Sequence, residues 1–299
     1  MQLPMIKCDT YNCFQFLIVT VAKYYKRDYR LMMLELWGFS YDITVDSTIG
    51  EKLKLCWSGR TKRRKQLLRY HGIDFNINYV TDTTVFINGN IKKGPIAVFV
   101  DSFVCPWVPF YQKMHRSHAF FLLECDVDSY YVFDQYCHET KINKGFIKNN
   151  VISIITFNQN EADLYDIKDK IRENLREWKE YGFSQYAAFV EDMEHSFSTE
   201  KEIGEDPTES KLVMHLKNLS EDRLNFIEAV EFFEEAFRGD LSVVKKIFQE
   251  ISIKYQKLRA YIIKYSFLQK VPQEEIIAKE MKGIYLLEKN AYEFIDKLL

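Results

Sequence analysis

The stretch HRSHAFFLLECDVDSYYVFDQY, residues 115–136, decides the fold of the first half of the chain. Two runs rich in aromatic and β-branched residues, 118–126 and 130–136, flank a short polar segment, a pattern typical of a β-hairpin. His118 opens the first run, and Asp134 lies near the end of the second. A hairpin would therefore bring a histidine and a carboxylate onto neighbouring strands.

The position of the turn decides whether these two side chains meet. With a turn centred on Asp126, residues 118 and 134 face each other directly, with Cβ atoms about 5 Å apart. With a turn centred on Asp128, Asp134 faces Leu122, about 13 Å along the strand from His118. The imidazole–carboxylate contact thus requires the earlier turn.

A cysteine stands near the start of a second stretch, TYNCFQFLIVTVAKYY, residues 10–25. Asp9, Thr10 and Asn12 are good capping residues before an apolar run of helical period, so a helix should begin close to Cys13. A helix N-terminus favours negative charge, and its N–H groups can stabilise an oxyanion. An imidazole beside the sulfur would take the thiol proton.

Cys13, His118 and Asp134 together form a candidate triad of nucleophile, base and orienting acid. The alternative is three core residues, because a cysteine among apolar neighbours is more often a buried small hydrophobe. His115 is a rival base in the preceding loop, and Cys8 is a rival nucleophile that precedes the helix start.

The remaining pattern predicts two domains. Residues 1–158 mix helical and strand-like runs, whereas 159–299 show helical spacing throughout, with a polar linker near 198–209. Further strands are predicted at 74–80, 94–102 and 151–157, helices at 14–25, 28–37 and 59–72, and a long aromatic loop at 103–117.

Composition argues against several classes of function. A net charge of −2 does not favour a nucleic-acid binder, and no apolar run reaches the roughly 18 residues of a membrane span. The first residues lack the features of a signal peptide, so a cytoplasmic protein with reduced cysteines is expected. The six cysteines lie between Cys8 and Cys137 without C-x2-C pairs, so no metal site is predicted.

The order of these segments resembles the N-terminal domain of the butirosin biosynthesis protein H family, found in antibiotic gene clusters. The resemblance rests on NCFQFLIVTVAKYYKRDY (12–29), LWGF (36–39) and the run from GPIAVFVDS to YYVFDQY (94–136). The family usually has a glycine after the histidine strand and a proline after the aspartate, where this chain has Glu124–Cys125 and Gln135.

The resemblance implies a papain-like α+β fold for residues 1–158, with Cys13 as nucleophile, His118 as base and Asp134 as orienting acid. It also implies an acyltransferase of natural-product (antibiotic-type) biosynthesis. Such an enzyme moves an acyl group from a thioester on an acyl or peptidyl carrier protein, through a cysteine thioester, to a small amine or hydroxyl acceptor. No bound cofactor is expected, because the phosphopantetheine arm of the carrier protein is the donor.

Other residues are interpreted within this expectation. Candidate substrate contacts are Asp101, Trp37, Trp57, Trp107 and Tyr111, with core packing as the alternative for the tryptophans. The basic run GRTKRRK is a candidate dock for an acidic carrier protein, or else a solvated helix face; its cations are Arg60, Lys62, Arg63, Arg64 and Lys65.

Two other functions remain open from the sequence. The same triad could serve a cysteine peptidase or amidase, which would need an open groove for an extended chain. A non-catalytic module that binds a carrier protein would instead bury Cys13 away from His118. In each case the helical domain could act as a substrate lid or a homodimer surface.

Overall fold

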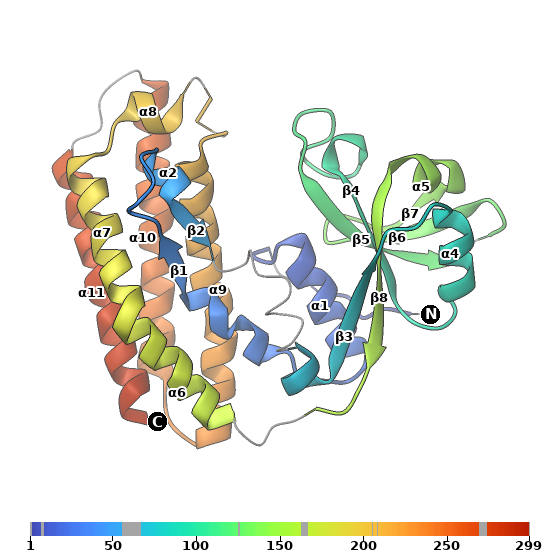
Figure 1. Cartoon of the computed structure of the whole chain (residues 1–299), viewed down its shortest axis with the longest axis horizontal. Coiled ribbons are helices and arrows are strands. Elements are labelled where there is room, and N and C mark those ends of the chain that lie inside the picture. Colours follow the sequence, from blue (N-terminus) through green and yellow to red (C-terminus); the bar gives the residue numbers. More distant parts are fainter. Residues whose placement is uncertain are drawn as a thin grey trace. The chain divides into compact units, whose positions relative to one another are not determined.

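The computed structural model describes residues 2–6, 9–55, 67–124, 126–162, 167–204, 206–207, 209–268 and 274–298. They form a mixed α+β structure with two antiparallel sheets and many helices, including a helical C-terminal region (Figure 1). The chain divides into two units. We call residues 1–29 and 61–164 the sheet unit, and residues 30–60 and 165–299 the helical unit.

The larger sheet has six strands in the order β3–β8–β4–β5–β6–β7, and every neighbouring pair is antiparallel. The strands are β3 (Ile73–Asn78), β4 (Ile96–Asp101), β5 (Ser117–Glu124), β6 (Ser129–Phe133), β7 (His138–Asn143) and β8 (Val151–Gln159). Five of them coincide with the predicted runs. The edge strand β7, HETKIN, is largely polar and pairs with β6, so it carries no apolar alternation that would predict a strand.

The two faces of this sheet are covered by different helices (Figure 1). Helix α1 (Cys13–Tyr24) packs on one face, where Phe16 contacts Phe121 and Phe133 with ring centroids 6.4 and 5.8 Å apart. The other face is a core that includes Phe120 and is covered by the short helices α4 (Thr83–Asn90) and α5 (Lys144–Asn150). Both short helices begin at a capping side chain, Asp82 and Asn143 respectively.

The segment between β4 and β5 contains little regular structure, in line with the predicted loop. A 3-10 turn, η3 (Ser102–Val104), follows β4, and further turns continue to residue 113. The loop closes on itself because the Ser102 hydroxyl donates to the Met114 carbonyl and the Ser102 N–H donates to the Arg116 carbonyl. The loop therefore returns the chain to the end of the sheet where β4 stopped.

The helical unit consists mainly of long helices and also contains a two-stranded sheet of β1 and β2. Its elements are η1 (Arg30–Trp37), β1 (Phe39–Tyr41), α2 (Ile49–Lys52), β2 (Leu53–Leu55), α6 (Ile167–Glu177), η4 (Trp178–Gly182), α7 (Phe183–His195), α8 (Thr199–Ile203), α9 (Lys211–Phe237), α10 (Ser242–Phe267) and α11 (Glu274–Leu298). The predicted helix at 28–37 is thus a 3-10 helix that begins at Arg30.

Residues 30–60 fold with the helices, which differs from the predicted division after residue 158. The reason is aromatic burial. Trp37 packs against Phe226 and Phe248 with centroids 5.2 and 5.4 Å apart, and Phe39 packs against Tyr186 at 5.0 Å. These rings dominate the burial of the segment and attach it to α7, α9 and α10.

Part of the predicted linker near 198–209 is ordered as helix α8. Its Glu202 is buried, and the carboxylate accepts hydrogen bonds from the Ile49 and Gly50 N–H groups at the start of α2. The two N–H donors favour the ionised carboxylate, while burial acts in the opposite direction and leaves the pKa of Glu202 raised. This contact holds residues 199–203 in place. The prediction of a linker there was wrong for these residues, because a polar composition does not exclude a buried ionic contact.

Candidate functional site: a cysteine, a histidine and an aspartate in the sheet unit

Cys13 is the first residue of α1, as its capping pattern predicts. The Asn12 side chain accepts from the Gln15 N–H at 2.9 Å, and the Gln15 side chain accepts from the Asn12 N–H at 2.8 Å. This capping box satisfies the N–H groups on either side of the first turn. Cys13 is a partly exposed residue, at the helix end where the dipole favours negative charge.

His118 lies at the start of β5 and Asp134 directly after β6. Both are buried, Asp134 completely, and the His118 Nε2 lies 2.6 Å from the Asp134 Oδ2. A carboxylate only accepts hydrogen bonds, so Nε2 carries the proton. The other ring nitrogen, Nδ1, is then the atom available to exchange a proton with a nucleophile.

The contact between His118 and Asp134 arises from a β5–β6 register other than the two predicted from the sequence. β5 and β6 pair with Leu122 opposite Val132 and Phe121 opposite Phe133, so the turn centres on residue 127. His118 and Asp134 are therefore diagonal neighbours on one face rather than directly opposed. The requirement for a turn at Asp126 was wrong, because diagonal neighbours stay within reach of long side chains.

Cys13 interacts with the same histidine. Burial of His118 acts to lower its pKa, but hydrogen bonds with Asp134 and Cys13, and the charges of these two groups, raise the pKa to about 9. The imidazole is thus favoured in its protonated form at neutral pH. An imidazolium beside a sulfur is one of the arrangements that favour a reactive thiolate.

Trp107, predicted as a substrate contact, instead donates its indole N–H to the Asp134 Oδ2 at 2.8 Å. The ring lies edge-on to Phe120, with centroids 5.2 Å apart. Asp134 therefore receives two donors on one oxygen, one from the histidine and one from the loop. A tryptophan N–H usually finds a partner when it is buried, but the sequence gives no sign of which acceptor it reaches.

The other predicted substrate contacts have different surroundings. Asp101 ends β4 and holds His115, with the His115 Nδ1 2.6 Å from the Asp101 Oδ2. Tyr111 is partly exposed in the same loop, and its hydroxyl accepts from the Gln112 side chain. Trp37 is buried in the helical unit, where its indole N–H donates to Glu288, so core packing accounts for it.

The remaining predicted residues lie outside the described part of the chain. Trp57 and the basic run lie within residues 56–66, which the structure does not describe. The cations of that run are Arg60, Lys62, Arg63, Arg64 and Lys65. The rival nucleophile Cys8 is not described either.

Two further thiols, those of Cys105 and Cys137, interact with the charge of Asp134, and the pKa of each is raised. Burial, together with the negative charges of Asp134 and Asp101, raises the pKa of Cys105 to about 12. Burial also raises the pKa of Cys137. A thiol whose pKa is raised is a poor nucleophile, so the described cysteine suited to attack is Cys13.

No protein-family model and no curated protein matches this chain. Within the described ranges, no helix has the length and apolarity needed to cross a membrane. The described side chains also contain no cluster of three or more histidine, cysteine or acidic residues that could hold a metal ion.

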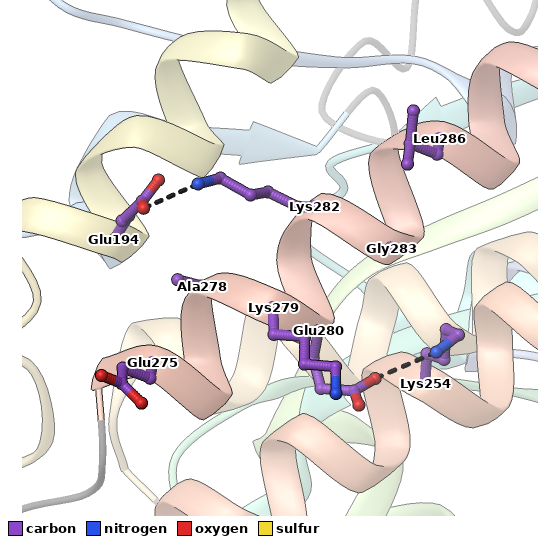
Figure 2. Close-up of a pocket in the computed structure, with 9 residues that line it drawn as sticks. All are labelled: Glu194, Lys254, Glu275, Ala278, Lys279, Glu280, Lys282, Gly283 and Leu286. Carbon is purple, nitrogen blue, oxygen red and sulfur yellow. Dashed lines mark hydrogen bonds and ion pairs between the residues drawn. The ribbon is translucent and has the colours of Figure 1, made fainter.

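Each unit has a surface hollow. One of about 340 Å³ lies beside Trp107 and is lined by Pro106, Trp107, Thr140, Lys141, Ile142, Asn143 and Phe146. The other, of about 550 Å³, lies in the helical unit along α11 (Figure 2). There Lys282 pairs with Glu194 of α7 and Glu280 with Lys254 of α10, so these charges neutralise one another.

Proposed function

We propose that this protein is an acyltransferase that forms a thioester on Cys13 and passes the acyl group to a small amine or hydroxyl acceptor. The observation that carries the proposal is the convergence of Cys13 and Asp134 on His118. Partial exposure of Cys13 favours a catalytic protein over a non-catalytic binding module, which would bury the sulfur.

In the first step the Cys13 thiolate attacks the carbonyl carbon of an acyl thioester. The new carbon–sulfur bond forms while the bond to the donor sulfur breaks, and protonated His118 gives its proton to the leaving thiolate. In this proposal the Cys13 N–H, one of the free N–H groups of the first turn of α1, donates to the oxyanion of the tetrahedral intermediate. The products are acyl-Cys13, neutral His118 and the free donor thiol.

In the second step the acceptor attacks acyl-Cys13, and neutral His118 removes a proton from the attacking atom. The acyl carbon–sulfur bond breaks, and Cys13 leaves as a thiolate beside the regenerated imidazolium. Asp134 keeps the ring in one orientation throughout, because it holds Nε2 in both protonation states.

The arrangement also supports a papain-like fold for the sheet unit. A helix that begins at the nucleophile packs on an antiparallel sheet, the base opens one strand, and the acid follows the next. This order agrees with the resemblance to the butirosin biosynthesis protein H family. By that resemblance the donor is a phosphopantetheine thioester on an acyl or peptidyl carrier protein, and the basic run 60–65 is its proposed dock.

The test is intact-mass spectrometry of the protein after mixing with an acetyl-phosphopantetheine carrier protein. We expect one added acetyl group on the wild type, none on Cys13→Ala, and an unchanged signal on Cys137→Ala. Addition of a primary amine should then release the acetyl group as an amide. Release as free acetate alone would indicate a hydrolase, and labelling that survives Cys13→Ala would overturn the proposal.

A further inference from the structure

A second histidine–carboxylate pair lies at the same end of the sheet as His118. The His115 Nδ1 is 2.6 Å from the Asp101 Oδ2, and the ring stacks on Phe103 with centroids 4.3 Å apart and planes 9° apart. Unlike His118, the His115 side chain is 72% exposed. The ring is therefore fixed in orientation yet open to solvent.

This pair is close to the triad in the fold. Val100 pairs with His118 across β4 and β5, and the next pair is Asp101 with Ser117. His115 precedes His118 by three residues, which limits their Cα separation to about 10 Å. The backbone positions that carry the two rings therefore lie close together at one end of the sheet.

The pairing of β4 and β5 also fixes the face on which Asp101 lies. Asp101 lies four residues after Ala97 on β4, so the two side chains share a face. Ala97 pairs with Phe121, and Phe121 packs against Phe16 of α1. Side chains two residues apart share a face of a strand. Asp101 is therefore on the face covered by α1, the helix that begins at the nucleophile, whereas His118 lies with Phe120 on the opposite face and meets Cys13 at the start of β5.

The chemistry of the pair follows from its hydrogen bonds. The hydrogen bond from His115 and that from the Phe103 N–H lower the pKa of Asp101, so its carboxylate stays ionised at neutral pH. Because a carboxylate only accepts hydrogen bonds, the neutral form of His115 has its proton on Nδ1 and presents Nε2 as an acceptor. The neighbouring Arg116 guanidinium lies over the Phe110 ring, 4.9 Å from the centroid, and Asp101 is the charged group bonded to His115.

Formation of an amide from a primary ammonium ion requires two proton acceptors. A primary amine is an ammonium ion at neutral pH and must lose two protons to become an amide. With a pKa like that of lysine, its reactive free-base fraction is of the order of one part in 10³. Neutral His118 can take only one of the two protons as Cys13 departs.

We propose that His115, oriented by Asp101, accepts the first proton of a primary ammonium acceptor, and that His118 accepts the second. The step converts acyl-Cys13, the ammonium ion and two neutral imidazoles into the amide, the Cys13 thiolate and two imidazolium ions. Charge and protons balance. The inference rests on the proposed acyl transfer and assigns the acceptor class as primary amines.

The test separates the two half-reactions. Acetyl-Cys13 is formed from S-acetyl-N-acetylcysteamine, freed of donor and mixed with either 2-aminoethanol or hydroxylamine at pH 7. Hydroxylamine is uncharged there and needs to lose one proton only. In His115→Gln we expect capture by 2-aminoethanol to fall about 100-fold, at the lower end of the range of general-base catalysis, with hydroxylamine capture and acetyl-Cys13 formation unchanged.

Three controls keep the outcome decisive. Asp101→Asn should impair 2-aminoethanol capture in the same selective way, added imidazole should restore it in His115→Gly, and the exposed His195→Gln should change nothing. Equal loss with both acceptors, or no loss in His115→Gln, would overturn the inference while leaving acyl transfer intact. Failure of the wild type to form acetyl-Cys13 would overturn the proposed function and this inference together.

Discussion

Asp134 receives hydrogen bonds from both His118 and Trp107 on its Oδ2 atom. We predict that Trp107→Phe slows acylation of Cys13 about 10- to 100-fold, because losing a hydrogen bond to a charged group costs about 1.5–3 kcal/mol. The ring packing on Phe120 would remain. Single-turnover mass spectrometry measures the rate.

Tyr111→Phe is the matched control for that substitution. It changes an aromatic residue of the same loop whose hydroxyl contacts Gln112, so it should leave the rate unchanged. An unchanged rate in Trp107→Phe would mean that His118 alone positions the carboxylate.

The raised pKa of His118 also predicts a pH-dependent stability. The histidine pKa is near 6.5 in an unfolded chain and about 9 in the folded protein, mainly because Asp134 and Cys13 outweigh the effect of burial. The contribution is therefore complete below about pH 6.5 and disappears as the pH rises through 9. A shift of this size corresponds to about 3 kcal/mol.

Urea unfolding of the wild type and of Asp134→Asn measures this contribution. The difference in unfolding free energy between them should be largest at about pH 6 and shrink by about pH 9.5. A difference that stays constant across this range would show that His118 does not titrate as described.

At the scale of elements, the capping box of α1 connects helix stability with the position of Cys13. We predict that Asn12→Ala lowers the unfolding free energy by about 1 kcal/mol and also slows Cys13 acylation several-fold. The reason is that the first turn frays and the sulfur and its N–H lose their fixed placement.

Asn143→Ala tests whether the loss of activity is specific. Asn143 caps α5 with the same residue type and the same contact to the third helical N–H. It should cost similar stability in denaturant titrations and leave acylation unaffected. Equal activity losses in the two variants would refute the special role of the α1 cap.

The sequence predicted the elements that carry the triad better than the contacts between them. The start of α1 was predictable because capping is local, and the strands around β5 were predictable from their apolar runs. The β5–β6 register was not, because a turn of a few polar residues allows several centres. The Trp107–Asp134 bond depends on how the loop 103–117 closes, which no local pattern specifies.

At the scale of the whole chain, residues 30–60 could not be assigned from sequence, because their partners lie more than a hundred residues away. Trp37 illustrates this: it packs on Phe226 and Phe248 and donates to Glu288. A segment flanked by elements of the sheet unit was therefore expected to belong to that unit.

The core of the helical unit contains a fully buried ion pair between Arg223 and Glu288, 2.7 Å apart. We predict that Glu288→Ala lowers the unfolding free energy by about 3–5 kcal/mol, because Arg223 would remain as an uncompensated buried charge. Denaturant unfolding followed by tryptophan fluorescence measures the effect, since Trp37 bonds the same carboxylate.

The exposed pair Lys217–Glu221 on α9 provides the comparison. Glu221→Ala should cost no more than about 0.5 kcal/mol, as expected for a surface i,i+4 pair. Replacing both buried partners, Arg223→Met with Glu288→Leu, should recover most of the loss. If the double variant is no more stable than Glu288→Ala, the unpaired charge is not the cause.

The central claim is that His118, held by Asp134, activates the sulfur of Cys13. Its most direct measurement is the rate of alkylation of Cys13 by iodoacetamide at about pH 6, located by peptide mass mapping, where an ordinary thiol is almost fully protonated. We predict that Cys13 reacts at least tenfold faster than Cys137 and that His118→Gln removes this advantage. Equal rates at Cys13 in the wild type and in His118→Gln would contradict the account.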